Sequence, residues 1–256
     1  MKDQPLILIT NDDGITAPGI RCLVEAVKDL GKIVVVAPDS PQSGMGHAVT
    51  IGEPLRLYKV SVFEGIESWQ SSGTPVDCVK LARDKILERK PDICLSGINH
   101  GANHSVNIIY SGTMSAAMEA AIEGIPSAGF SLMNHNYDAD FTLSGKIARE
   151  VAQKMLSNTL DPHTLLNVNI PDVAAEQYKG IRVCRQAYAK WIEEFDERVD
   201  PNGKKYYWMT GRFESMDTGT DTDVEALQEG YVSIVPVTYD LTNYAMKDKI
   251  AAMWRQ

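Results

Sequence analysis

Two adjacent carboxylates, Asp12 and Asp13, come directly after a short apolar run and directly before Gly14. Two carboxylates side by side repel each other unless a cation or hydrogen-bond donors offset their charge. Hard oxygen ligands of this kind suit Mg²⁺, Mn²⁺ or Ca²⁺. A polar turn between a strand and a helix explains the same three residues without any ligand, so this motif alone leaves both interpretations open.

Two further polar, glycine-bearing segments also follow apolar runs: residues 38–47, which contain Ser43, and residues 96–105, which contain Asn99. If the three runs are parallel strands, their carboxyl ends meet at one edge of the sheet, where ligands bind in open α/β folds. The oxygen-bearing side chains at these three strand ends form a set that suits one divalent ion, Mg²⁺ or Mn²⁺: Asp12, Asp13, Ser43 and Asn99.

A polar segment, Ser111-Gly112-Thr113, opens a run of small and apolar residues at helical spacing. Free N–H groups and the positive end of the helix dipole make such a start suitable for a phosphate. Capping of the helix by Ser111 or Thr113 is compatible with that role. We expect these three residues to bind phosphate together with Asn99 and Asn103.

If the bound phosphate is an ester, we expect its hydrolysis by direct attack of a metal-bound water, with Asp12, Asp13 and Asn103 as the catalytic residues. No hydroxyl or thiol in these segments has an activating base beside it in the sequence. Histidine can act as a general acid near neutral pH, and three histidines lie in or beside the segments: His47, His100 and His104. We expect His47 to be a loop residue hydrogen-bonded to backbone, and the proton donor stays open.

The elements that must position these residues follow the apolar pattern of the chain. Residues 6–10 and 33–37 read as buried strands on either side of a helix over 18–29 that ends at Gly31. Strand, helix and strand in this order start a doubly wound sheet. The same pattern predicts further strands at 91–95, 127–133 and 165–170, a helix beginning at Thr74-Pro75 and a helix over about 143–155.

Two regions follow a different pattern. Residues 50–59 read as an antiparallel strand pair around Gly52. Beyond residue 171, strands at 181–187 and 206–210 flank a polar, aromatic segment, 188–205, and a helix, a strand and a last helix follow at 224–230, 231–237 and 244–254. We therefore expect an α/β protein with a Rossmann-like, doubly wound, mostly parallel core over residues 1–171. A β-rich extension over residues 172–256 would carry an oligomerisation arm and a closing helix.

Composition limits the partners and the location of the protein. A net charge of −9 argues against a general nucleic-acid binder, which normally presents a basic face. No apolar stretch approaches the roughly 20 residues of a membrane span, and the N-terminal apolar run is too short for a signal peptide. The four cysteines are scattered without a CxxC pair, so we expect reduced thiols in a cytoplasmic protein.

The site residues stand within a series of longer motifs: ILITNDDG at 7–14, APDSPQSGMGHAVT at 37–50, SSGTPVDCV at 71–79, SGINHGANHS at 96–105, YSGTMSAAME at 110–119 and GTDTDVEALQEGYVSIVPV at 219–237. In this order, and over nearly the full length, the motifs resemble the survival protein E (SurE) family of metal-dependent nucleotide phosphatases. The resemblance implies 5′/3′-nucleotidase activity on nucleoside monophosphates. It also implies a divalent metal at Asp12, Asp13, Ser43 and Asn99, and a domain-swapped C-terminal arm that builds homodimers or homotetramers.

Two positions depart from the family pattern. Ser105 stands where the family usually has glycine, and Asn107 stands where a carboxylate is common.

Two other functions stay open at this point. One is a phosphatase with an aspartate nucleophile, which needs a second carboxylate two residues after the first, where this chain has Gly14. The other is a nucleotide-binding regulatory module without turnover.

Overall fold

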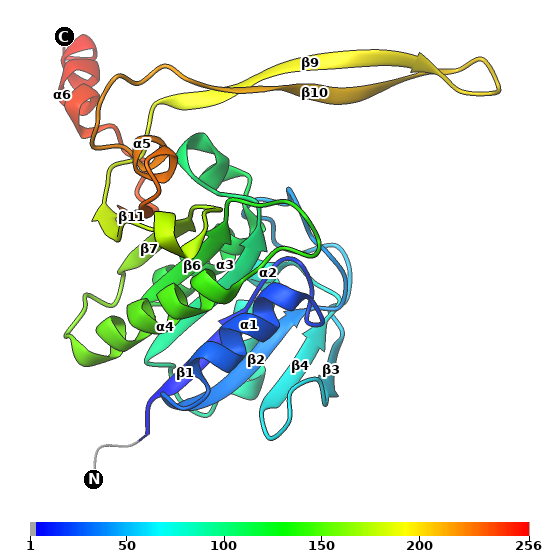
Figure 1. Ribbon diagram of the computed structural model, residues 1–256, viewed down its shortest axis with the longest axis vertical. Helices are drawn as coiled ribbons and strands as arrows, with labels where there is room; N and C mark the ends of the chain where they lie inside the picture. The colour runs from blue at the N-terminus through cyan, green and yellow to red at the C-terminus, as the bar shows by residue number, and fades with distance from the viewer. Residues whose placement is uncertain (1–3, 256) are drawn as a thin grey trace.

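The computed structural model describes residues 4–255. Its centre is a sheet with the strand order β3-β4-β2-β1-β5-β6-β7-β11-β8 (Figure 1). Neighbouring strands are parallel, except that β3 pairs antiparallel with β4 and β11 pairs antiparallel with β7. The fold is therefore α/β with a mostly parallel sheet, as the sequence predicts. The strands of this sheet are β1 (Leu6–Thr10), β2 (Lys32–Pro38), β3 (Leu57–Val60), β4 (Glu67–Ser71), β5 (Ile93–His100), β6 (Ser127–Leu132), β7 (Leu165–Ile170), β8 (Ile181–Val183) and β11 (Val232–Val237).

Helices cover both faces of this sheet, which explains why the first strand is apolar without alternation. Ile7 and Ile9 pack on the side of α1 (Pro18–Val27) and α4 (Thr142–Ser157). Leu6 and Leu8 pack on the opposite side. That side is covered by α2 (Pro75–Leu81) and α3 (Gly112–Ile122). The two buried faces fix the register of β1 and therefore the position at which its carboxyl end delivers the next residues.

The start of α2 confirms a local prediction. Thr74 accepts a hydrogen bond from the Asp77 N–H at 3.2 Å, and the Asp77 carboxylate accepts one from the Thr74 N–H at 2.9 Å, with Pro75 in the first helical position. This is a capping box, which satisfies two otherwise unpaired donors. Gly31, in contrast, does not cap α1, which ends at Val27. A β-carbon at Gly31 would lie 2.4 Å from the Pro5 carbonyl oxygen, so the glycine permits a close backbone approach.

Two predicted strand boundaries are wrong. The predicted strand pair at 50–59 is absent, because only Leu57–Val60 forms a strand and its partner is β4. Strand β5 runs to His100, past the predicted end at Leu95. Gly97 permits this extension with φ +127°, and a β-carbon there would lie 2.5 Å from the Phe130 carbonyl oxygen of the neighbouring strand.

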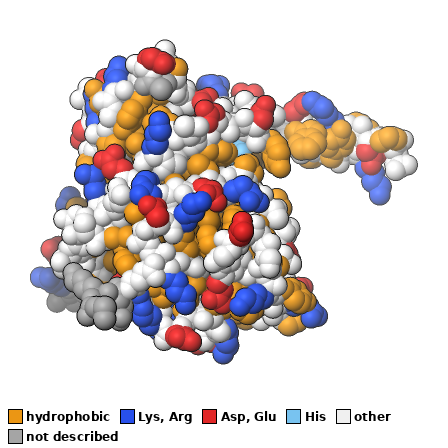
Figure 2. All heavy atoms as spheres, turned by 60° about the horizontal axis from the view of Figure 1, so that its bottom comes forward, with side chains coloured by type: hydrophobic (Ala, Val, Ile, Leu, Met, Phe, Trp, Pro, Cys, Tyr) orange, Lys and Arg blue, Asp and Glu red, His pale blue; other side chains and the backbone are white. Residues whose placement is uncertain are grey.

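The C-terminal part forms a hairpin arm that projects from the body (Figure 1). Its strands, β9 (Ala189–Val199) and β10 (Lys205–Ser215), pair antiparallel. Strand β9 corrects the prediction of a polar segment between strands at 188–205. Nearly every arm residue is exposed, and hydrophobic side chains lie along the projection (Figure 2). The helix α6 (Tyr244–Met253) likewise buries none of its side chains.

The short helix α5 (Asp223–Gln228) connects the arm to β11. Strands β8 and β11 lie beyond residue 171 yet belong to the main sheet, so the two parts of the chain share one sheet. Strand β8 ends at Val183, earlier than predicted. The domain division at residue 171 stays a prediction.

Among residues 4–255, no helix combines the length and the apolar character that crossing a bilayer requires. All four cysteines are free thiols, as predicted.

Candidate active site

The three predicted strand-end segments meet at one edge of the sheet. The Ile15 N–H donates to the Pro38 carbonyl at 2.9 Å, which joins the segment after β1 to the end of β2. The Gln42 N–H donates to the Asp12 carbonyl at 2.8 Å and holds the segment containing Ser43 beside the carboxylates. The His100 N–H donates to Asp13 Oδ2 at 3.4 Å and joins the end of β5 to the same place.

Asp12 is a buried carboxylate held by the start of α3. Its side chain accepts a short hydrogen bond from the Thr113 hydroxyl. The pKa of Asp12 is raised to about 6, mainly by burial and in smaller part by the neighbouring Asp13, while the hydrogen bond from Thr113 acts in the opposite direction. A buried carboxylate beside a second carboxylate therefore calls for a cation.

Asp13 is oriented by His100. The imidazole Nδ1 lies 3.1 Å from Asp13 Oδ2, and because a carboxylate only accepts, this nitrogen carries the proton. The His100 ring packs edge-on against Phe141 with a centroid distance of 4.9 Å and lies parallel to the Tyr137 ring. Its Nε2 atom is buried without a hydrogen-bond partner in the described chain. These contacts fix the imidazole and, through it, the rotamer of Asp13.

The two neutral candidate ligands, Asn99 and Ser43, are together held by fewer side-chain hydrogen bonds than the two carboxylates. Asn99 Nδ2 donates to the Gly101 carbonyl at 2.8 Å, which leaves Oδ1 without a hydrogen bond among residues 4–255. Ser43 is exposed, and in that part of the chain its hydroxyl makes no hydrogen bond either. The structure thus brings the segments of Asp12, Asp13, Ser43 and Asn99 together. Their convergence on one ion stays a prediction.

The donor atoms at this edge fit a hard divalent ion. In the described part of the chain, no three His, Cys, Asp or Glu side chains form a metal-binding group. A metal here has to be held by the two carboxylates and by neutral amide and hydroxyl oxygens. No lysine or arginine between residues 4 and 255 forms an ion pair with Asp12 or Asp13, so their charge is left for a cation to offset. Oxygen-only donors match Mg²⁺ or Mn²⁺.

The start of α3 lies against this carboxylate pair. Ser111 caps the helix by accepting the Met114 N–H at 3.0 Å, as predicted. A β-carbon at Gly112 would lie 2.9 Å from Asp12 Oδ2, so the helix start and the carboxylate are in direct contact. The Thr113 hydroxyl gives its one proton to Asp12 and cannot also donate to a phosphate. A phosphate at this helix start would therefore need other donors than that hydroxyl, such as backbone N–H groups.

Asn103 belongs to a buried network that the sequence reading missed. Its Nδ2 donates to Ser131 Oγ at 2.7 Å, its N–H donates to Asn169 Oδ1 at 2.7 Å, and its carbonyl accepts from Asn167 Nδ2 at 2.8 Å. One amide hydrogen of Asn103 is left to donate to a ligand. The available signal was the pair of asparagines at alternate positions in an otherwise apolar strand, LLNVNI.

Comparison with known proteins decides the family. A model of the family described as "Survival protein SurE" matches residues 7–193. A protein named 5′-nucleotidase SurE from Christiangramia forsetii is 57% identical over 250 residues, which cover 96% of each chain. A protein of the same name from Cytophaga hutchinsonii is 53% identical over 98% of each chain.

This chain belongs to the SurE family. A solved structure of the SurE protein from Aquifex aeolicus is 42% identical to it, with a TM-score of 0.84 over 97% of this chain and 99% of that one. The resemblance inferred from the motifs is therefore confirmed, and so is the fold class. The family match covers every candidate ligand and the start of α3, which all lie between residues 7 and 193.

One histidine differs from its prediction as a loop residue bonded to backbone. His47 Nε2 lies 2.9 Å from the Glu119 carboxylate instead of binding backbone, and Lys80 pairs with the same carboxylate. His104 is buried against Phe213 with a ring centroid distance of 4.8 Å, and this burial lowers its pKa. His100 is thus the histidine that contacts a candidate metal ligand. The sequence analysis also did not predict the ion pairs of Glu119, because its partners His47 and Lys80 are distant in the sequence.

Proposed function

We propose that this member of the SurE family is a nucleotidase that hydrolyses the phosphate ester of nucleoside monophosphates. Full-length relatives named 5′-nucleotidases, at 57% and 53% identity, support the substrate class. The observation that carries the reaction type is the contact between the start of α3 and Asp12. It places an anion-binding helix terminus directly beside two carboxylates, which is where a phosphate and a divalent cation would meet.

The proposal includes one divalent ion, Mg²⁺ or Mn²⁺, held by Asp12, Asp13, Ser43 and Asn99. Such an ion would lower the pKa of water, polarise a phosphoryl oxygen and fix in-line geometry. The support is the oxygen-only donor set and the burial of Asp12 without an arginine or lysine partner in the described residues. With Ser43 and Asn99 neutral, the charge of a divalent ion would balance that of the two carboxylates, so the loaded site would no longer repel a phosphate and the ion itself could attract a phosphoryl oxygen.

The chain's own groups would bind and orient the substrate. The N–H groups of Gly112 and Thr113, with the remaining amide hydrogen of Asn103, would hold the phosphoryl oxygens as their charge shifts in the transition state. Thr113 fixes the rotamer of Asp12, and His100 fixes that of Asp13. Asp12 is then the candidate to orient the attacking water and to take its proton.

Three finer statements belong to the same proposal. We include 3′-monophosphates as substrates, which the motif resemblance supports. The assembly would be a homodimer or homotetramer through the arm, because the hairpin and α6 expose aromatic side chains that bury little on their own chain. A cytoplasmic location is supported by the four free cysteines.

The test is phosphate release from 5′-AMP and 3′-AMP in the presence of MnCl₂, with ligand binding measured in parallel by calorimetry. The proposal predicts release from both nucleotides. Binding without release would support the regulatory module instead. Release from p-nitrophenyl phosphate and from neither nucleotide would overturn the nucleotidase assignment, while release from 5′-AMP alone would overturn only the 3′ part.

A further inference from the structure

Ser105 has a backbone conformation that its residue type disfavours. It lies two residues after Asn103, at the start of the 3₁₀ helix Ser105–Ile109, with φ +53° and no exposed surface. The left-handed region is costly for a residue with a side chain unless its surroundings hold it there. The contacts of Ser105 therefore identify what holds this part of the site.

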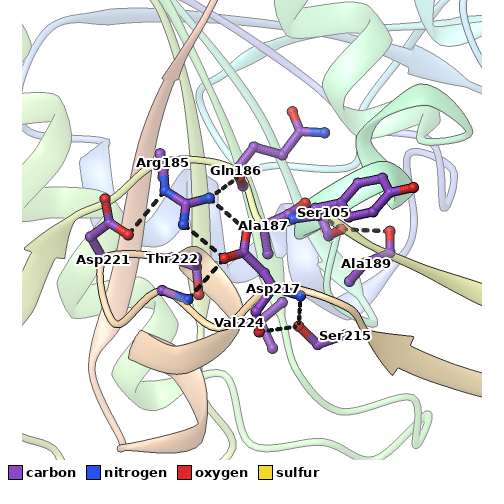
Figure 3. A network of polar contacts seen from close by, with 12 residues as sticks. Ser105, Arg185, Gln186, Ala187, Ala189, Ser215, Asp217, Asp221, Thr222 and Val224 are labelled. Atoms are coloured by element: carbon purple, nitrogen blue, oxygen red, sulfur yellow. Dashed lines mark hydrogen bonds and ion pairs between the residues drawn. The ribbon is translucent and has the colours of Figure 1, made fainter.

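Those contacts come from the base of the hairpin arm and from the start of α5 (Figure 3). The Ser105 N–H donates to Asp223 Oδ2 at 2.8 Å. Its Oγ lies 2.9 Å from the carbonyl oxygens of both Ala187 and Ala189, so its single hydroxyl proton is shared between them. Asp223 is itself fully buried and accepts the N–H groups of Ala187 and Val224 at 2.9 Å each.

The hairpin base is in turn held together by charge. The Arg185 guanidinium donates to both carboxylate oxygens of Asp217, at 2.6 and 2.8 Å, and to Asp221 Oδ1 at 2.9 Å (Figure 3). Asp217 also accepts the Tyr188 N–H at 3.0 Å. These bonds tie the chain entering the arm to the chain leaving it. The two carbonyls that meet Ser105 are therefore fixed in space.

Segment 103–105 thus lies between two supports. On one side, Asn103 is bonded to Asn167, Asn169 and Ser131 on the sheet. On the other side, Ser105 is bonded to the hairpin base. Neighbouring contacts reinforce the second support: the Trp191 Nε1–H donates to Asn107 Oδ1 at 3.0 Å.

We infer that Ser105 is a positioning residue: its hydroxyl ties the Asn103 segment to the hairpin base and thereby sets the position of the Asn103 amide. The inference rests on the proposed function in so far as Asn103 is taken to contact the phosphate. It makes the base of the arm a structural part of the active site in each chain. Ser105 itself does not touch the substrate.

The test is a double-mutant cycle on the full-length protein with 5′-AMP and MnCl₂. Ser105→Gly removes the hydroxyl and suits the left-handed backbone, and Ser105→Ala removes it while keeping the β-carbon. Each should lower kcat/KM roughly three- to tenfold, the effect of one lost hydrogen bond. In an Asn103→Ala background the same changes should alter kcat/KM less than twofold, because the group that they position is gone.

The matched control is Ser215→Ala. Ser215 lies at the same hairpin base and accepts the Asp217 N–H at 3.3 Å, but its side chain is exposed and hydrogen-bonds only within the arm segment among the described residues. It should leave kcat/KM unchanged. Equal losses from the Ser105 changes in both backgrounds, or no loss in either, would overturn the inference.

The binding of inorganic phosphate, measured by calorimetry, separates this inference from the proposed function. If the wild-type protein hydrolyses no nucleotide, the proposed function fails, and the cycle is read on the phosphate Kd instead. Ser105→Gly should then weaken phosphate binding in the wild-type background and not in the Asn103→Ala background. An unchanged Kd in both backgrounds would contradict the positioning role. If Asn103→Ala alone has no effect on activity or binding, the inference also fails, because Asn103 is then not the group that Ser105 positions.

Discussion

The backbone of Gly112 packs directly against the side chain of Asp12. A β-carbon at Gly112 would lie 2.7 Å from Asp12 Cβ and 2.9 Å from Oδ2, closer than such atoms approach in proteins. The first turn of α3 and the carboxylate after β1 are therefore set against each other without room for a side chain. This contact joins the two halves of the proposed site, the phosphate-binding helix start and the carboxylate pair.

Gly112→Ala should disable the site while leaving most of the fold intact. The added methyl group has to displace Asp12 or the helix start, and a shift of about 1 Å in a reacting group costs roughly a hundredfold in rate. We expect kcat/KM for 5′-AMP to fall about a hundredfold, with a loss of about 1–3 kcal/mol in the free energy of unfolding. Steady-state kinetics and urea denaturation measure the two effects.

The control for this change is Gly52→Ala, where a β-carbon would meet no atom within 4 Å. It should alter neither kcat/KM nor stability by more than experimental error. Wild-type kinetics in Gly112→Ala would show that the helix start does not contact the reacting groups.

Asp12→Asn should stabilise the metal-free protein at neutral pH. Burial raises the pKa of Asp12 from 3.8 to about 6 in the folded chain. A carboxyl whose pKa is raised by folding contributes stability that is fully present below pH 3.8 and is lost as the pH rises through about 6. The asparagine variant does not titrate, so its advantage over the wild type should grow from pH 4 to pH 7 and reach at most about 3 kcal/mol.

Urea denaturation of both proteins in EDTA, at several values between pH 4 and pH 7, measures this difference. Adding Mn²⁺ at pH 7 should reverse it, because binding to the folded state alone stabilises the wild type. If the difference in the free energy of unfolding stayed constant across the pH range, folding would not raise the pKa of Asp12 and the prediction would be wrong.

Because the hairpin arm exposes apolar side chains, we expect copies of the chain to associate. Phe195 and Met209 face each other across the hairpin and are 65% and 69% exposed. A two-stranded hairpin with exposed apolar side chains is marginally stable alone, so we expect at least a dimer. Sedimentation velocity at micromolar concentration should show it, and Phe195→Asp with Met209→Asp should shift the protein toward monomer. A compact wild-type monomer would contradict this prediction.

Apolar pattern predicted the parts of the fold that are buried on both faces. The run from Leu6 to Thr10 and the strands near 33–37, 127–133 and 165–170 were recognisable because helices cover both faces of the sheet. Strand β4, ESWQS, was not predicted because its residues show no apolar periodicity. It forms through backbone pairing with β2 and β3, which lie on either side of it in the sheet. Strand β9 escaped for a related reason: it buries almost nothing in its own chain.

The candidate site was likewise predictable only in part. The positions of Asp12 and Asp13 follow from local sequence, because a parallel strand places the residues after it at a known edge of the sheet. Asn99 lies near the same edge, but within β5 rather than after it. The partners that orient the site come from distant positions and left no local pattern. The Asn167–Asn103 bond spans 64 residues, and the Ser105–Asp223 bond spans 118.

The metal dependence of nucleotide hydrolysis tests the proposed site at the carboxyl ends of β1, β2 and β5. Phosphate release from 5′-AMP should be measured in wild-type protein with EDTA, after add-back of excess Mg²⁺ or Mn²⁺, and in Asp12→Asn under the same conditions. We predict that EDTA abolishes turnover, that a divalent ion restores it, and that Asp12→Asn stays inactive throughout while folded. Turnover that persists in EDTA, or a variant with near wild-type activity, would contradict the assignment of this edge of the sheet as a metal-dependent phosphatase site.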